Sequence, residues 1–143
     1  MGTAASWTRE TPNGFPSSLQ VAEFVLTADA DGIDSAYTAE HVVGEVVKVE
    51  VDPGTLNPAA TIKAYEYGTL LATGTRDHFL DYTVPDPAVE VVFYPLVESS
   101  ATNANGALTT KVSQRRVSAG QIECDLAGAT EDDTVTVRLY VQN

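Results

Sequence analysis

The chain has 143 residues, with 20 Asp and Glu against eight Lys and Arg, which gives a formal net charge of −12. This length is typical of one domain, and a hydrophobic fraction of 43% is sufficient for a buried core, so a wholly disordered chain is excluded. The negative charge repels phosphate backbones, and we therefore expect no direct binding to nucleic acid. No apolar run is long enough to span a bilayer, and the N-terminus lacks the pattern of a signal peptide. We expect a protein that is made in a host cytoplasm and is not inserted in a membrane.

The acidity has two interpretations. Carboxylates can simply keep a protein in solution, or they can keep its surface hydrated in concentrated salt, where the salt screens their mutual repulsion. The chain has only three lysines, Lys48, Lys63 and Lys111. Because this shortage accompanies the carboxylate excess, the pattern favours a high-salt environment, although a cold or marine setting gives a similar composition.

The first eighteen residues form a predicted extended arm, and residues 19–143 form a predicted single domain. Residues 1–18 contain two prolines, two glycines and no periodic apolar pattern. Trp7 and Phe15 are large apolar side chains on this polar segment. One interpretation is a frayed terminus; the other is an arm whose aromatic side chains, Trp7 and Phe15, contact a neighbouring subunit.

From residue 19 onward, apolar residues recur with a period of two, which is typical of β-strands. The predicted strands are 19–27, 41–52, 61–67, 69–72 as a short hairpin arm, 87–96, 108–113, 121–126 and 134–142. Segment 87–96 has apolar residues at both parities, which predicts a strand covered on both faces. No segment shows helical spacing over three turns. The pattern predicts an all-β domain, an antiparallel β-sandwich or small barrel of about eight strands.

Asp29, Asp31 and Asp34 surround Gly32 and are the weak candidates for a metal site. Three carboxylates near a glycine resemble a calcium loop, but the glycine precedes the third carboxylate and no flanking helices are predicted. Asp-Gly is also a favoured tight-turn pair. We therefore interpret the segment as an acidic turn and predict no metal.

No catalytic residue or cofactor site is predicted. His41 follows Glu40, and His78 lies between Asp77 and Asp81, so a metal or acid–base site requires the fold to bring the two histidines together. The single cysteine, Cys124, alternates with polar neighbours and is interpreted as a buried apolar side chain. No nucleophile elbow or phosphate-binding loop is present, and no pair of carboxylates stands out. We expect a protein that is not an enzyme.

Tyr65 and Tyr67 alternate with Lys63 on one predicted face. Such tyrosines can form a platform on which a sugar or base stacks. More often they are cross-strand pairs within a sheet, and that is our interpretation.

Several segments resemble, in the same order, a group of small β-rich virion proteins encoded beside the capsid genes of tailed double-stranded DNA viruses. In the first half these are FVLTADADG at 24–32, YT at 37–38, VGEVVKV at 43–49 and DPGTL at 52–56. In the second half they are YP at 94–95, NGA at 105–107, AGQI at 119–122 and TVTVRLYV at 134–141. The resemblance covers roughly residues 19–143 and supplies no binding residues, because its motifs are patterns of strands and turns.

The resemblance implies a head-associated structural protein of the virion, either a decoration (cement) subunit of the capsid or a vertex (turret) subunit. Its expected partners are the major capsid protein or other virion proteins, and further copies of itself as a trimer or fivefold assembly. The acidity then implies a virus of a salt-loving archaeon, or a marine phage. The alternatives are a tail tube, head-completion or baseplate subunit, and a carbohydrate-binding β-sandwich that would use Tyr65, Tyr67 and Trp7. A small hydrolase is the least favoured alternative.

Overall fold

The computed structural model describes residues 4–9, 19–67, 78–94, 96–102, 108–115 and 117–142. Every regular element in these ranges is a strand. In strands β1, β8 and β9 and at His78, the structure describes the backbone only. The described residues contain no helix that is long and apolar enough to cross a membrane.

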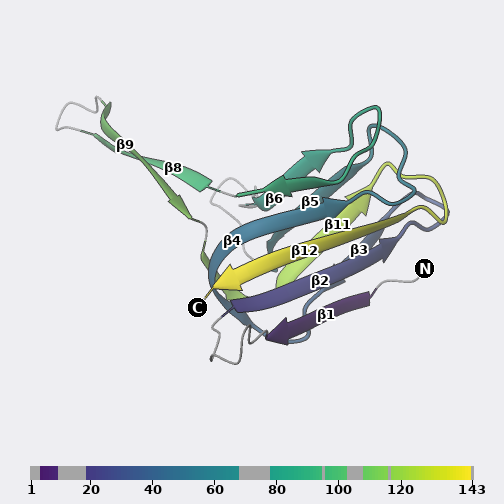
Figure 1. Cartoon of the computed structure of the whole chain (residues 1–143), viewed down its shortest axis with the longest axis horizontal. Helices are drawn as coiled ribbons and strands as arrows, with labels where there is room; N and C mark the ends of the chain where they lie inside the picture. The colour runs from purple at the N-terminus through teal and green to yellow at the C-terminus, as the bar shows by residue number, and fades with distance from the viewer. Residues whose placement is uncertain are drawn as a thin grey trace.

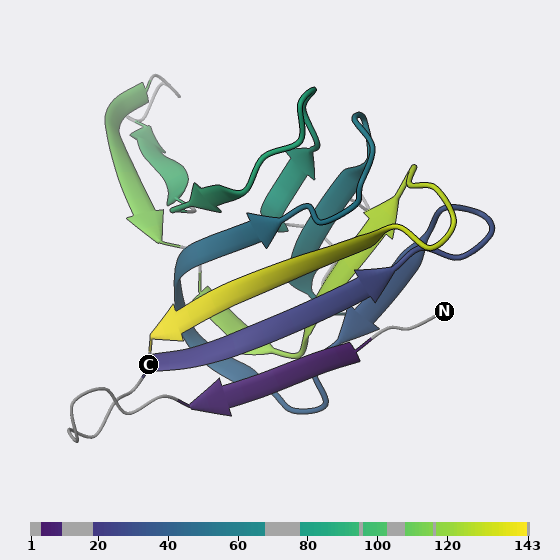
Figure 2. The ribbon, with the colours of Figure 1, turned by 45° about the vertical axis from the view of Figure 1, so that its right-hand side comes forward.

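The strands form two main antiparallel sheets, one of six strands and one of four. The six-stranded sheet contains β1 (Ala4–Arg9), β2 (Leu19–Thr27), β12 (Thr134–Gln142), β4 (Val42–Asp52) and β10 (Val117–Gly120) in that order, and β7 (Val91–Phe93) pairs with the other half of β4. The four-stranded sheet has the order β3 (Asp34–Tyr37), β11 (Ile122–Ala127), β5 (Thr61–Glu66) and β6 (His78–Thr83). The two sheets lie face to face as the layers of a sandwich (Figures 1 and 2). The predicted all-β class is confirmed, and the sandwich is the correct alternative because the sheets do not close into a barrel.

The core lies between the two sheets and follows the predicted alternation. In β12, Val135, Val137, Leu139 and Val141 are at most 1% exposed, whereas the intervening residues are half-buried on the outer side. Phe24 and Leu26 enter the same core from β2, and the four-stranded sheet contributes Ile62, Ile122, Cys124 and Leu126. Burial of these apolar side chains is the main stabilising term, at about 1.5–3 kcal/mol for each large one.

The segment 87–96 differs from its prediction. Its strand, β7, has only three residues and lies at the edge of the six-stranded sheet, where it pairs with β4. Val92 is 43% exposed and Tyr94 is 69% exposed. The prediction of cover on both faces was therefore wrong, because each sheet of a two-layer sandwich has one outer face, and nothing in the described residues covers that face at β7.

The predicted N-terminal arm contains a strand that the sequence pattern did not reveal. Ala4–Arg9 pair antiparallel with β2 of the same chain, and Trp7 is the register partner of Ala22. The backbone at Trp7 is thus part of the edge of the six-stranded sheet. Phe15 and the predicted hairpin arm at 69–72 lie outside the described residues.

Strands β8 (Leu96–Thr102) and β9 (Leu108–Arg115) form a separate two-stranded ribbon. Within the described parts of the chain they hydrogen-bond only with each other, from Leu96 opposite Arg115 to Thr102 opposite Leu108. The ribbon projects away from the sandwich and extends well beyond the ends of both sheets (Figure 1). Segment 108–113 was predicted as a strand, but its separation from both sheets was not.

Candidate interaction surfaces

The acidic turn between β2 and β3 uses its carboxylates to bind the backbone. Asp29 Oδ1 accepts hydrogen bonds from the amides of Asp31 at 2.9 Å and Ile33 at 3.2 Å. Asp34 Oδ2 accepts a hydrogen bond from the amide of Thr27 at 2.8 Å, across the turn. Two of the three carboxylates, those of Asp29 and Asp34, thus stabilise the turn by accepting backbone hydrogen bonds. Among the described residues, no group of three or more His, Cys, Asp or Glu side chains is arranged to hold a metal ion.

The fold does not place the two histidines on neighbouring strands. His41 is exposed and follows β3 in the chain, whereas His78 is the first residue of β6. In the four-stranded sheet, β11 and β5 lie between β3 and β6. The side chain of His78 and residue Asp77 lie outside the description. The topology therefore gives no support to a shared histidine site.

Cys124 has the buried position that the sequence predicted. Its side chain is 0% exposed in the core, and burial raises the pKa of the thiol well above its ordinary value, with smaller contributions from Asp125 and Glu123. The thiol form, which is a poor nucleophile, is thus strongly favoured.

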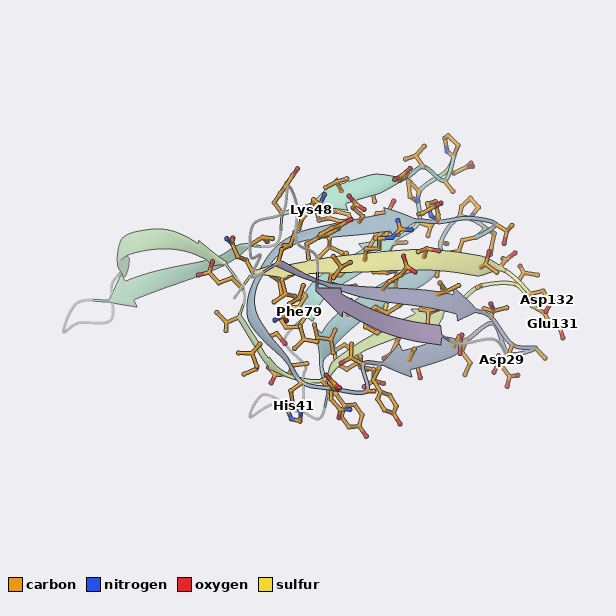
Figure 3. All side chains as sticks on the ribbon, turned by 60° about the horizontal axis from the view of Figure 1, so that its bottom comes forward. Asp29, His41, Lys48, Phe79, Glu131 and Asp132 are labelled. Atoms are coloured by element: carbon orange, nitrogen blue, oxygen red, sulfur yellow. The ribbon has the colours of Figure 1, made fainter. Side chains whose placement is uncertain are left out.

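The outer face of the six-stranded sheet carries a polar network across β2, β12 and β4. Arg138 pairs with Glu23 at 2.6 Å and lies 4.0 Å from Glu50. Glu50 also accepts hydrogen bonds from Lys48 at 2.8 Å and from the Tyr140 hydroxyl at 2.9 Å, while Lys48 Nζ lies 4.1 Å from the centre of the Tyr140 ring. The bond from Lys48 is the main reason that the pKa of Glu50 lies below its ordinary value. Two cationic and two anionic side chains are therefore paired within this network, and Figure 3 labels one of them, Lys48.

The outer face of the four-stranded sheet is different, and we call it the acidic face. We define it by its outward residues Ser35, Tyr37, Lys63, Tyr65, Tyr67, Asp81, Glu123 and Asp125. It contains three carboxylates and one ammonium group. An open depression of about 510 Å³ lies at its β3–β11 side and is lined by Asp29, Ile33, Asp34, Ser35, Glu123, Asp125 and Leu126. The face is therefore strongly negative at one end.

Two tyrosines form an exposed aromatic pair on the acidic face. The rings of Tyr37 and Tyr67 stack with centroids 5.2 Å apart and planes at 21°, and the two residues are 55% and 50% exposed. Tyr65, by contrast, is 4% exposed and donates its hydroxyl hydrogen to Asp125. The sequence singled out Tyr65 and Tyr67 but missed Tyr37, because Tyr37 reaches Tyr67 from a strand on the far side of β11.

The predicted interface residues and the ribbon complete the candidate surfaces. The backbone of Trp7 lies in β1, its side chain is outside the description, and Phe15 lies outside the described residues altogether. Sequence reasoning missed the projecting ribbon. The sequence does distinguish this segment by a cluster of basic residues. Arg115-Arg116 is the only adjacent basic pair in the chain, and Lys111 lies four residues before Arg115.

Comparisons of this chain with protein-family models, with curated proteins and with solved structures find no match. The residues and the fold therefore carry the functional argument.

Proposed function

We propose that this protein is a structural component of a virion, a capsid decoration (cement) or vertex subunit that acts by self-association and attachment to the capsid shell. The resemblance of residues 19–143 to small head-associated proteins of tailed viruses supports this role. The acidity and the lysine shortage support a virus of a high-salt or marine environment. The major capsid protein, other virion proteins and further copies of the chain are the proposed partners.

The observation that carries the proposal is the projecting ribbon β8–β9. Isolated two-stranded ribbons are at best marginally stable in water, because neither face is packed. A ribbon also has two edges whose backbone groups are open to further pairing. A chain that keeps seven- and eight-residue strands away from its own core is therefore suited to contact another surface.

The sandwich would act as the rigid body that positions this ribbon. Its core contains side chains from both sheets, so the base of the ribbon is connected to a tightly packed unit. Edge strands β1, β3 and β6 offer further sites for contact with a shell. Closed symmetry, a trimer or a fivefold arrangement, would multiply weak single contacts into firm attachment.

The proposal is tested on intact particles from the virus that encodes the chain. Antibodies raised against residues 19–143 should label the heads of purified virions, either over the whole shell or at the vertices. The purified chain should also bind shells assembled from the major capsid protein. Labelling confined to tails would support the tail-subunit alternative, and absence from particles would overturn the proposal.

A carbohydrate-binding role retains one supporting observation, the exposed Tyr37–Tyr67 pair. Sugar-binding platforms, however, present ring faces to the ligand, and here one face of each ring is already used by the other tyrosine. Tyr65 is buried and is not available for such a platform. A glycan array probed with the purified chain separates this role from the structural one, because specific binding that is lost in Tyr37→Ala would favour the carbohydrate-binding module.

A further inference from the structure

We propose that the β8–β9 ribbon of one copy docks on the acidic face of a second copy. This inference rests on the assembly function proposed above and names the contact that would build the assembly. It identifies one occupant for the acidic face, another copy of the same chain, and one surface on which the ribbon packs.

Charge complementarity is the first argument. By sequence the ribbon contains Lys111 and Arg115 against a single carboxylate, Glu98, in a chain with twelve more negative than positive groups. The acidic face has the opposite balance, with Asp81, Glu123 and Asp125 against Lys63, and Asp29 and Asp34 line the adjoining depression. Opposed patches of this kind steer association and select the partner at moderate ionic strength, and concentrated salt weakens the attraction.

Apolar surface beside the carboxylates is the second argument. Tyr37 and Tyr67 are each about half exposed at one end of the four-stranded sheet, where Tyr37 is the register partner of Glu123, and Ile33 is about half exposed at the other end, beside Asp34. Aromatic rings next to carboxylates suit a segment that contains Lys and Arg, because cations contact ring faces and carboxylates alike. On the outer face of the six-stranded sheet, Arg138 pairs with Glu23 and Lys48 pairs with Glu50, within one chain.

The position of the ribbon is the third argument. It leaves the sandwich at the end opposite to the loops that carry Asp29, Glu131 and Asp132 (Figure 3). It extends away from the four-stranded sheet of its own chain (Figure 1). A basic element at one end and an acidic depression toward the other favour a head-to-tail contact between copies, and such contacts close into rings when the rotation between subunits permits.

The size of the ribbon indicates that one contact is weak. Two strands of about seven residues cover roughly 23 Å by 10 Å, which is below the roughly 800 Å² per partner of a stable interface. In a closed ring each copy would make the contact twice, once with its ribbon and once with its acidic face. Ring closure then provides the stability that a single pair lacks.

The test uses charge reversal on each side of the contact. One variant carries Lys111→Glu and Arg115→Glu in the ribbon, and the other carries Asp81→Lys and Glu123→Lys on the acidic face. Sedimentation velocity in about 0.15 M salt should show that the wild-type chain assembles and that each variant associates at least about tenfold more weakly. A variant that carries all four substitutions should assemble again, because each reversed ribbon then meets a reversed face in a ring of any size.

A matched control carries Glu90→Lys and Glu131→Lys, two exposed carboxylates outside both surfaces, and should assemble like the wild type. Thermal unfolding of every variant checks that the sandwich is intact. The self-docking proposal is overturned if the reversed pairs assemble normally, if the variant with all four substitutions stays dissociated, or if the wild type remains monomeric. A monomer that still binds capsid shells, or whose ribbon binds DNA, would overturn the self-contact while the particle-labelling experiment decides the proposed function separately.

Discussion

The Tyr140 hydroxyl on β12 donates a hydrogen bond to the Glu50 carboxylate on β4 at 2.9 Å, although the two residues are 90 positions apart in the chain. The same carboxylate accepts a hydrogen bond from Lys48 at 2.8 Å and lies 4.0 Å from Arg138. Glu50 thus joins two central strands of the six-stranded sheet through three neighbours. These neighbours favour its ionised form and keep its pKa below the ordinary value of 4.5.

Glu50→Gln should lower the free energy of unfolding by about 1 kcal/mol near neutral pH, because it removes the charge that Lys48 and Arg138 stabilise. Since the folded-state pKa is depressed, the ionised carboxylate stabilises the fold above its ordinary pKa, and this contribution is lost as the pH falls through the folded value. Urea unfolding at a series of pH values should show the two proteins converging as the pH falls below the ordinary pKa of 4.5 and through the lower folded-state pKa.

Glu45→Gln, on the exposed part of the same strand, is the control and should change stability little at any pH. A constant difference between wild type and Glu50→Gln across the acid range would contradict the ionic origin of the effect.

Gly32 and Gly128 give a matched pair for backbone sterics. Both have left-handed φ values, 75° and 71°. A Cβ at Gly32 would collide with the carbonyl oxygen of Ala129, whereas a Cβ at Gly128 would meet its nearest neighbour, the Ala59 oxygen, at 3.7 Å. Gly128→Ala should cost about 1–2 kcal/mol from the conformation alone, and Gly32→Ala should cost at least about 1 kcal/mol more. Chemical denaturation measures both values, and equal costs would contradict the predicted collision.

Cys124 should be unreactive toward a thiol reagent such as DTNB while the protein is folded. The side chain is fully buried, and the raised pKa of the thiol removes the reactive thiolate. In denaturant the same thiol should react completely and rapidly. The ratio of the two rates reports how often the core opens, and fast labelling of the folded protein would show that the two sheets are not tightly packed around this position.

The Tyr37–Tyr67 stack should contribute a measurable coupling energy. A double-mutant cycle with Tyr37→Ala and Tyr67→Ala should give about 0.5–1 kcal/mol, as for other offset aromatic pairs. A cycle that combines Tyr37→Ala with Tyr94→Ala, which is 69% exposed and lies beyond β7, should be additive within about 0.5 kcal/mol. Equal coupling in both cycles would contradict a specific contact between the stacked rings.

The alternation of apolar residues was sufficient to predict the strands of the core and the side chains that they bury. Val135, Val137 and Leu139 lie in the core as predicted, and so does Cys124. Short strands were harder to predict, since β3 and β10 have four residues each and their sequences contain too few alternations to establish a period. Strand β1 was missed because its apolar residues do not alternate regularly.

The interaction surfaces depend on tertiary structure for a different reason. Side-chain alternation is a local property, so residues 19–143 by themselves determined an all-β chain with buried valines and leucines. Strand pairing joins distant residues, and nothing local in Glu50 indicates that Tyr140 will be its neighbour. In the same way, only the fold brought Tyr37 onto Tyr67 and left β8 and β9 paired with each other, away from the two sheets.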